Sequence, residues 1–160
     1  MQSLKVTFDN GRGQKLSGRL DLPADRFPHN YAIFAHCFTC SKDFSAARNI
    51  CRSLASEGFG VLRFDFTGLN KSEGDFADTN FSTNIEDIIA AAQFLEEEYK
   101  APGLLVGHSL GGAAVLFAGS MIDSVKSKRN TPKPSEASDL QILRAAEKSL
   151  LQVKQCAKMA

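Results

Sequence analysis

The chain has 160 residues, of which 43% are hydrophobic and 23% are charged, and its formal net charge is +1. A chain of this length and composition is predicted to fold as one soluble domain, and its balanced charge gives no electrostatic case for a nucleic-acid or membrane partner. The N-terminus lacks the apolar core of a signal peptide and no stretch approaches the roughly 18 apolar residues of a membrane span, so a cytoplasmic location is predicted.

The first elements are predicted to form an antiparallel hairpin. Two runs of alternating polarity, residues 4–9 and 15–22, are joined by a loop that contains Gly11 and Gly13. Alternation of this kind is typical of strands, and Pro23 would end the second run. The chain is therefore expected to begin with a β-hairpin.

After the hairpin, short apolar runs alternate with longer segments of helical period, which is typical of parallel strands joined by crossover helices. Strands are predicted at residues 31–35, 60–66 and 104–106, and helices at residues 44–57, from about 84 to just before Pro102, and from 110 or 111 to 117. Thr83 and Glu86 are predicted to form the capping box of the second helix. The pattern predicts the α/β fold class.

The alternation stops after residue 121. Residues 122–137 are polar, contain two prolines and are predicted to be a linker. Residues 138–160 are predicted to form an amphipathic helix, because apolar side chains recur there at spacings of three and four after a capping box of Ser138 and Gln141. This helix is basic, which favours a solvated face, with an acidic surface or partner as the alternative. The predicted core is residues 1–121.

One pentapeptide contains a sequence motif that indicates a reactive serine. Residues Gly107, His108, Ser109, Leu110 and Gly111 fit the pattern G-x-S-x-G between a predicted strand and a predicted helix. A sharp strand-to-helix turn would give Ser109 an uncommon backbone conformation and hold its hydroxyl at the edge where α/β sheets bind ligands. Gly107 and Gly111 would omit side chains where neighbouring elements collide, and the Leu110 N–H could donate to an oxyanion. The alternative is that these glycines only let a helix pack close to a strand.

Three separated motifs, "HCFTCSKD", "LRFDFTGLNKSEGDF" and "GHSLGGAA", occur in order in a chain whose resemblance to one family covers about residues 4–120. Together they resemble α/β-hydrolase-fold proteins, especially the hydrolase half of bacterial fusions with an OsmC-type domain. The resemblance implies the N-terminal portion of the α/β-hydrolase fold and a serine hydrolase that acts on carboxylic esters or related acyl compounds through an acyl-Ser109 intermediate. It further implies that the backbone N–H groups of Phe38 and Leu110 form the oxyanion hole.

Two features depart from the family pattern. The loop at residues 68–72 reads GLNKS where the family has G-x-G-x-S, and Asn70 tolerates a left-handed backbone better than most residues. The family order of catalytic residues is Ser, then Asp or Glu, then His, yet no histidine follows Ser109. We therefore expect a truncated or frameshifted hydrolase domain with weak or absent turnover, or else a non-catalytic remnant or interaction module that keeps the fold.

The polar residues near the predicted site are considered as substitutes for the catalytic histidine and acid that the family pattern requires. His36 ends the first parallel strand and is expected to shape the oxyanion loop, although it is also the histidine nearest the site in the family's geometry. His108 adjoins Ser109 but should point away from it, and His29 lies in a surface loop. Asp65 ends the second parallel strand, where it could be catalytic; we favour a role in organising neighbouring loops through hydrogen bonds.

Neither a cofactor nor a metal is predicted. Cys37 and Cys40 form a C-x-x-C pair, but no second ligand pair follows at a suitable spacing, and the four cysteines of the chain are predicted to be reduced. The predicted partner is a small acyl substrate. The strand at 104–106 would also be an exposed sheet edge, which favours self-association or a partner chain there unless the terminal helix covers it.

Overall fold

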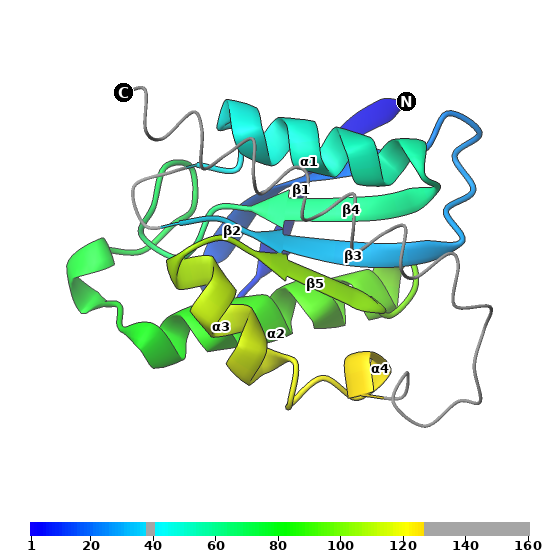
Figure 1. Cartoon of the computed structure of the whole chain (residues 1–160). Helices are drawn as coiled ribbons and strands as arrows, with labels where there is room; N and C mark the ends of the chain where they lie inside the picture. Colours follow the sequence, from blue (N-terminus) through cyan, green and yellow to red (C-terminus); the bar gives the residue numbers. More distant parts are fainter. Residues whose placement is uncertain (38–40, 127–160) are drawn as a thin grey trace. The chain divides into compact units, whose positions relative to one another are not determined.

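The sheet of this domain is mixed and has five strands. A computed structural model of the chain describes residues 1–37 and 41–126. Its strands lie in the order β1-β2-β4-β3-β5 (Figure 1). The strands are β1 (Gln2–Asp9), β2 (Lys15–Leu22), β3 (Asn30–Ala35), β4 (Phe59–Phe64) and β5 (Leu104–Gly107). β2 pairs antiparallel with β1 and β4, whereas β3 pairs parallel with β4 and β5, so the predicted hairpin and parallel strands are confirmed.

Helices cover both faces of the sheet (Figure 1). α1 (Ser45–Ser56) lies on one face, and α2 (Phe81–Glu98) and α3 (Leu110–Ala118) lie together on the other. The helices between parallel strands are crossover connections, and they place the ends of β3, β4 and β5 at one edge of the sheet. This edge is where ligands bind in open α/β sheets.

The start of α2 differs from the prediction. The helix begins at Phe81 because Asn80 is its N-cap: the Asn80 side chain accepts a hydrogen bond from the Thr83 N–H at 3.1 Å, and the Thr83 hydroxyl accepts one from the Asn80 N–H at 2.9 Å. Thr83 is therefore the third helical residue of this reciprocal box rather than the cap itself. The predicted box of Thr83 with Glu86 is wrong, and the helix is one turn longer at its start.

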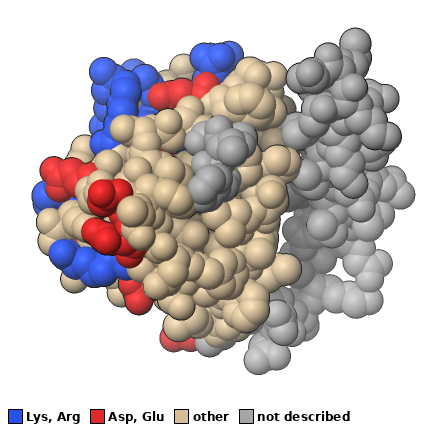
Figure 2. Space-filling model, turned by 90° about the vertical axis from the view of Figure 1, so that its left-hand side faces the viewer, with Lys and Arg blue, Asp and Glu red and all other residues tan. Residues whose placement is uncertain are grey.

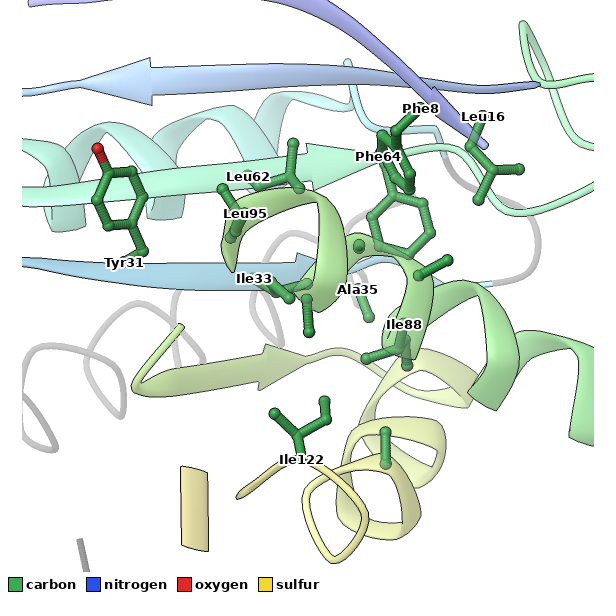
Figure 3. Close-up of a cluster of buried hydrophobic side chains, with 14 of the residues drawn as sticks. Phe8, Leu16, Tyr31, Ile33, Ala35, Leu62, Phe64, Ile88, Leu95 and Ile122 are labelled. Carbon is green, nitrogen blue, oxygen red and sulfur yellow. The ribbon is translucent and has the colours of Figure 1, made fainter. Parts of the chain in front are cut away.

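The main core lies between the sheet and the helices α2 and α3 (Figure 3). Its fully buried side chains include Leu16, Leu20, Ile33, Leu62, Phe64, Ile88 and Leu95. Every residue of β4 is buried, as is all of β3 after its first residue, because helices cover these central strands on both sides. The central strands thus give the loops at their ends a rigid base.

The described chain ends in a short helix, α4 (Asp123–Lys126). α4 falls within the stretch that was predicted to be a linker, so the start of that stretch is helical. The rest of it, together with the predicted helix at residues 138–160, lies outside the described residues. Within the described part of the chain, every helix is too short or too polar to span a bilayer.

Candidate functional site

Ser109 occupies the turn between β5 and α3. Its backbone has φ 55° and ψ −116°, its side chain is exposed, and its carbonyl accepts the Ala113 N–H at 3.1 Å to open the helix. A non-glycine residue in this region of backbone space is strained by about 1–3 kcal/mol, and such strain is concentrated at functional sites. The hydroxyl therefore stands on a fixed bend at the edge of the sheet. Its role as a nucleophile stays a prediction at this point.

The two glycines that flank the turn have no room for side chains. A Cβ at Gly107 would lie 2.4 Å from the carbonyl oxygen of Gly111, and a Cβ at Gly111 would lie 2.3 Å from the carbonyl oxygen of Ala35. The turn is also joined to β3 by a hydrogen bond from the His108 N–H to the Ala35 carbonyl at 3.1 Å. The glycines thus bring the start of α3 directly against the end of β3.

One of the two predicted oxyanion donors is described. Leu110 is the first residue of α3, so its N–H has no acceptor within the helix and lies at the positive end of the helix dipole. An N–H in this position, one residue after Ser109, is suited to stabilise negative charge on an attacked carbonyl oxygen. Phe38, the second predicted donor, lies outside the described residues.

The ring of His36 is buried and does not face solvent beside Ser109. Its Nδ1 donates to the Cys37 carbonyl at 2.6 Å, its Nε2 lies 3.7 Å from Asp65 Oδ1, and it packs edge-on against Phe66. Nε2 has no hydrogen-bond partner among the described residues. Burial lowers the pKa of His36, which favours a neutral ring. Its backbone carbonyl, by contrast, borders the turn, 2.6 Å from where a Cβ of Gly111 would lie.

Asp65 is fully buried and joins two loops at this edge. Its Oδ1 accepts the Lys42 N–H at 2.8 Å and the Asn70 side-chain amide at 3.4 Å, and its Oδ2 accepts from the Lys42 ammonium group. Asn70 has φ 49°, the left-handed conformation that was predicted to be tolerated in the GLNKS loop. Asp65 therefore ties the residues that follow β3 to the loop that follows β4.

Buried charges extend from Asp65 under α1, and sequence reasoning missed them. Arg63 donates to Asp21 Oδ2 at 2.9 Å, to Asp43 Oδ1 at 2.9 Å and to the carbonyl oxygen of Lys42. The pKa of Arg63 is raised by its hydrogen bond and charge interaction with Asp21, against the opposing effect of burial. The sequence did contain a signal for these buried charges, namely charged residues within strands whose other residues are mostly apolar.

A second buried group links the hairpin to α2. Asp87 is fully buried; its carboxylate accepts the Thr67 N–H and the Thr67 hydroxyl, both at 2.8 Å, and pairs with Arg12 at 3.1 Å. Asn10 donates to the Thr67 hydroxyl oxygen at 3.0 Å. Near this group, a polar pocket of about 240 Å³ is lined by Arg12, Gln14, Thr67, Asp75, Asp78, Thr79 and Thr83.

One of the two described cysteines differs from the prediction. Cys37 is disulfide-bonded, so it is not reduced as predicted. Cys51 is a free thiol on the buried side of α1, and burial raises its pKa, which keeps it protonated and unreactive. Among residues 1–37 and 41–126, no three His, Cys, Asp or Glu side chains gather in a group that could hold a metal ion.

Known proteins share this fold and part of this sequence. The esterase domain of a Rhodothermus marinus protein is 51% identical, with a TM-score of 0.63 over 78% of this chain and 47% of that domain's chain. Est1E from Butyrivibrio proteoclasticus, solved with ferulic acid bound, is 27% identical, with a TM-score of 0.67 over 72% of this chain and 47% of the other. The chain thus spans about half the length of these solved structures.

The curated relatives agree at the level of the family. The mitochondrial palmitoyl-protein thioesterase ABHD10 of Mus musculus is 33% identical over 73 residues, which is 46% of this chain and 23% of that protein. The sequence model of the Alpha/beta hydrolase family matches residues 32–152, a segment that begins in β3 and includes the Ser109 turn. The chain belongs to the alpha/beta hydrolase family.

Proposed function

We propose that the domain is a serine hydrolase that acts on carboxylic esters or related acyl compounds such as thioesters, with Ser109 as its nucleophile. The observation that carries the proposal is the strained backbone of Ser109, φ 55° and ψ −116°, at the edge where the parallel strands end. Backbone strain of this kind clusters at functional sites, which favours a chemical role for Ser109. The esterase and thioesterase names of the relatives favour the same reaction class.

The proposed reaction follows from what surrounds the hydroxyl. Ser109 Oγ attacks the acyl carbon, and the Leu110 N–H at the start of α3 stabilises the oxygen that becomes negative. The alkoxide or thiolate leaves with a proton and the acyl group stays on Ser109 until water releases it. The N–H of Phe38 is our candidate for the second donor to the same oxygen.

The surface at this edge favours an uncharged substrate. Figure 2 looks onto the side of the molecule where β3, β4 and β5 end, and uncharged residues make up most of the described surface there. Lys, Arg, Asp and Glu gather mainly along one side of the view. An acyl chain or aromatic acyl group could approach over such a face without removing water from a charge.

We propose that proton transfer from Ser109 limits the rate of the reaction in this polypeptide. His36 is buried against Cys37 and Asp65, and no histidine follows Ser109 in the sequence. Transfer of the Ser109 proton then falls to solvent, and loss of a triad base typically costs several orders of magnitude in rate. The 160-residue polypeptide should therefore acylate slowly and release the acyl group more slowly still.

A fluorophosphonate probe tests the proposal directly. The probe should add once to the folded chain by displacement of fluoride by Ser109 Oγ, as measured by intact mass. Ser109→Ala should show no adduct, whereas Ser120→Ala, which removes an exposed hydroxyl just after α3, should react like the wild type. Equal labelling of Ser109→Ala and the wild type would show that another residue reacts.

A second candidate function comes from a different class. α3 exposes large apolar side chains at its end, with Leu116 at 79% and Phe117 at 59% exposure, which is typical of surfaces that contact other proteins. A non-catalytic interaction module that keeps the hydrolase fold would show this face and no reaction with the probe. A folded wild type that stays unlabelled favours this alternative.

A further inference from the structure

The polar pocket beside Asp87 is built from four segments that lie far apart in the sequence. They are the turn between β1 and β2, the residues just after β4, the short 3-10 helix η1 (Phe76–Asp78) with its flanks, and the start of α2. Because β2 runs antiparallel to β4, the β1–β2 turn lies at the edge of the sheet where β4 ends. The pocket, of about 240 Å³, therefore lies at the same edge as the Ser109 turn.

The inner wall of this pocket is held by hydrogen bonds within the protein. The Thr67 hydroxyl donates to Asp87 at 2.8 Å, and it accepts from Asn10 at 3.0 Å and from Arg12 at 3.2 Å. Arg12 in turn pairs with Glu86 at 2.7 Å and with Asp87 at 3.1 Å. Two carboxylates thus match the charge of Arg12, which closes one side of the pocket without adding an unmatched positive charge.

Gly74 brings the acidic side of the pocket close to the hairpin. Its φ is 95°, and a Cβ there would lie 2.7 Å from Thr67 Cγ2 and 2.9 Å from Gln14 Nε2. Both of these neighbours line the pocket. The missing side chain therefore lets Asp75, the next residue in the chain, lie against the β1–β2 turn.

The acidic side of the pocket has oxygen atoms that the described residues leave without a donor. Asp75 Oδ1 accepts the Ala77 N–H at 2.9 Å, whereas Asp75 Oδ2 has no partner in the described part of the chain. The same is true of the whole Asp78 carboxylate. The Thr79 hydroxyl donates to the Phe76 carbonyl at 2.8 Å, and its lone pair receives no hydrogen bond from any described residue.

These acceptors favour a cation that carries several N–H donors. A primary ammonium group has three N–H donors and no acceptor, which suits one pocket that offers two carboxylates and a hydroxyl oxygen. Hydrogen bonds from an ammonium group to a carboxylate are about twice as strong as those between neutral groups. A Ca²⁺ ion fits less well, because it takes about six to eight oxygen ligands, and no metal-binding group of three acidic, His or Cys side chains exists among the described residues.

We propose that this pocket binds the primary ammonium group of a small alkylamine, with Asp75 and Asp78 as its charge partners. The ligand adds the donors that these oxygens lack, and it meets a wall that is already rigid at Thr67 and Arg12. This is a second site, and it does not depend on whether Ser109 is a nucleophile.

A titration of the ¹⁵N-labelled chain of 160 residues, followed by ¹H–¹⁵N NMR spectra, tests the site residue by residue. The probe is n-butylammonium chloride at constant ionic strength, and 1-pentanol is the uncharged probe of the same length. Asp75→Asn and Asp78→Asn each remove one charge. Asp25→Asn is the matched control, because Asp25 is also exposed and its Oδ1 accepts the Phe27 N–H at 3.0 Å, as Asp75 Oδ1 does that of Ala77.

We expect n-butylammonium to bind with a dissociation constant of about 1–10 mM, as for a very small ligand, and to shift the N–H signals of Ala77, Thr79 and Thr83. Asp75→Asn and Asp78→Asn should each weaken binding by about 5- to 20-fold, whereas Asp25→Asn should bind like the wild type. Nα-acetyl-lysine amide, titrated in the same way, shows whether a lysine side chain of another protein is an equal ligand.

Three results would overturn the inference. They are equal binding of 1-pentanol, an affinity for n-butylammonium that stays unchanged in Asp75→Asn and Asp78→Asn, and signal shifts that extend equally to Phe27 at the opposite edge of the sheet. Tighter binding of Ca²⁺ than of the ammonium probe would also overturn it, since the site would then be a metal site. Fluorophosphonate labelling of the same protein sample reports on Ser109 separately, so failure of either proposal is seen by itself.

Discussion

At the residue scale, the Ser109 turn depends on glycines that lack a Cβ where neighbouring backbone lies close. The strain of φ 55° at Ser109 is tolerated because α3 packs so close to β3 that the backbone has no freedom to relax. Gly111 is the contact point, since its missing Cβ would lie 2.3 Å from the Ala35 carbonyl oxygen. Gly112, the next residue, is different, because a Cβ there would meet nothing closer than 3.4 Å.

These neighbouring glycines make a matched pair for mutation. Gly111→Ala should destabilise the domain by about 1–3 kcal/mol, the usual cost of an overpacked site, and should abolish fluorophosphonate labelling because the turn must shift. Gly112→Ala should leave the stability equal or raised by up to about 1 kcal/mol, since alanine is the better helix former. Urea unfolding measures both; a loss in Gly112→Ala as large as that in Gly111→Ala would contradict this account of the turn.

At the element scale, the periodicity of apolar residues predicted every described strand and the helices α1 to α3. The residue at which a helix begins depends instead on its capping hydrogen bonds. The repeat of apolar residues in α2 was readable from the sequence, but two overlapping capping boxes were available there. Asn80 with Thr83 prevails over Thr83 with Glu86, and the extra turn brings Phe81 against Phe117 at a ring distance of 5.5 Å. That contact is between distant segments, so no local pattern could have revealed it.

The Asn80 cap gives a prediction at this scale. Asn80→Ala removes the acceptor for the Thr83 N–H and should lower the free energy of unfolding by about 1 kcal/mol, as loss of an N-cap does. Asn49→Ala is the control, because Asn49 is exposed within α1 and alanine favours a helix interior. Urea unfolding of the two variants should give opposite signs. An Asn80→Ala variant as stable as the wild type would show that the box does not set the start of α2.

At the scale of the whole molecule, polar groups join parts that the sequence keeps far apart. The motif residues were readable because G-x-S-x-G has a fixed local geometry, while the partners of Asp65 and Asp87 were not, because Lys42 and Arg12 lie 23 and 75 residues away. Arg12 comes from the turn between β1 and β2, so its pair with Asp87 fastens the antiparallel hairpin to α2. Such pairings depend on the sheet order, which the local patterns did not specify.

The Asp87 carboxyl should make the stability of the whole domain depend on pH. Two effects on its pKa oppose each other: burial raises the pKa, and the hydrogen bonds from Thr67 together with Arg12 lower it. Burial dominates, because Asp87 is fully buried and the exposed Glu86 shares the Arg12 charge. The folded state therefore binds the Asp87 proton more tightly than the unfolded state, whose carboxyl has a pKa of about 3.8.

The sign of the effect follows from proton binding. The stability that Asp87 contributes is complete below its unfolded pKa and is lost as the pH rises through the higher folded pKa. The free energy of unfolding of the wild type, minus that of Asp87→Asn, should therefore fall as the pH rises from about 3.8 toward neutrality, because the variant carries no titrating group at that position. Glu86→Gln, which removes the exposed carboxylate on the same arginine, controls for loss of charge next to Arg12. A difference that grows with pH would mean that the Arg12 pair outweighs burial, and the hairpin would then be held to α2 chiefly by an ion pair.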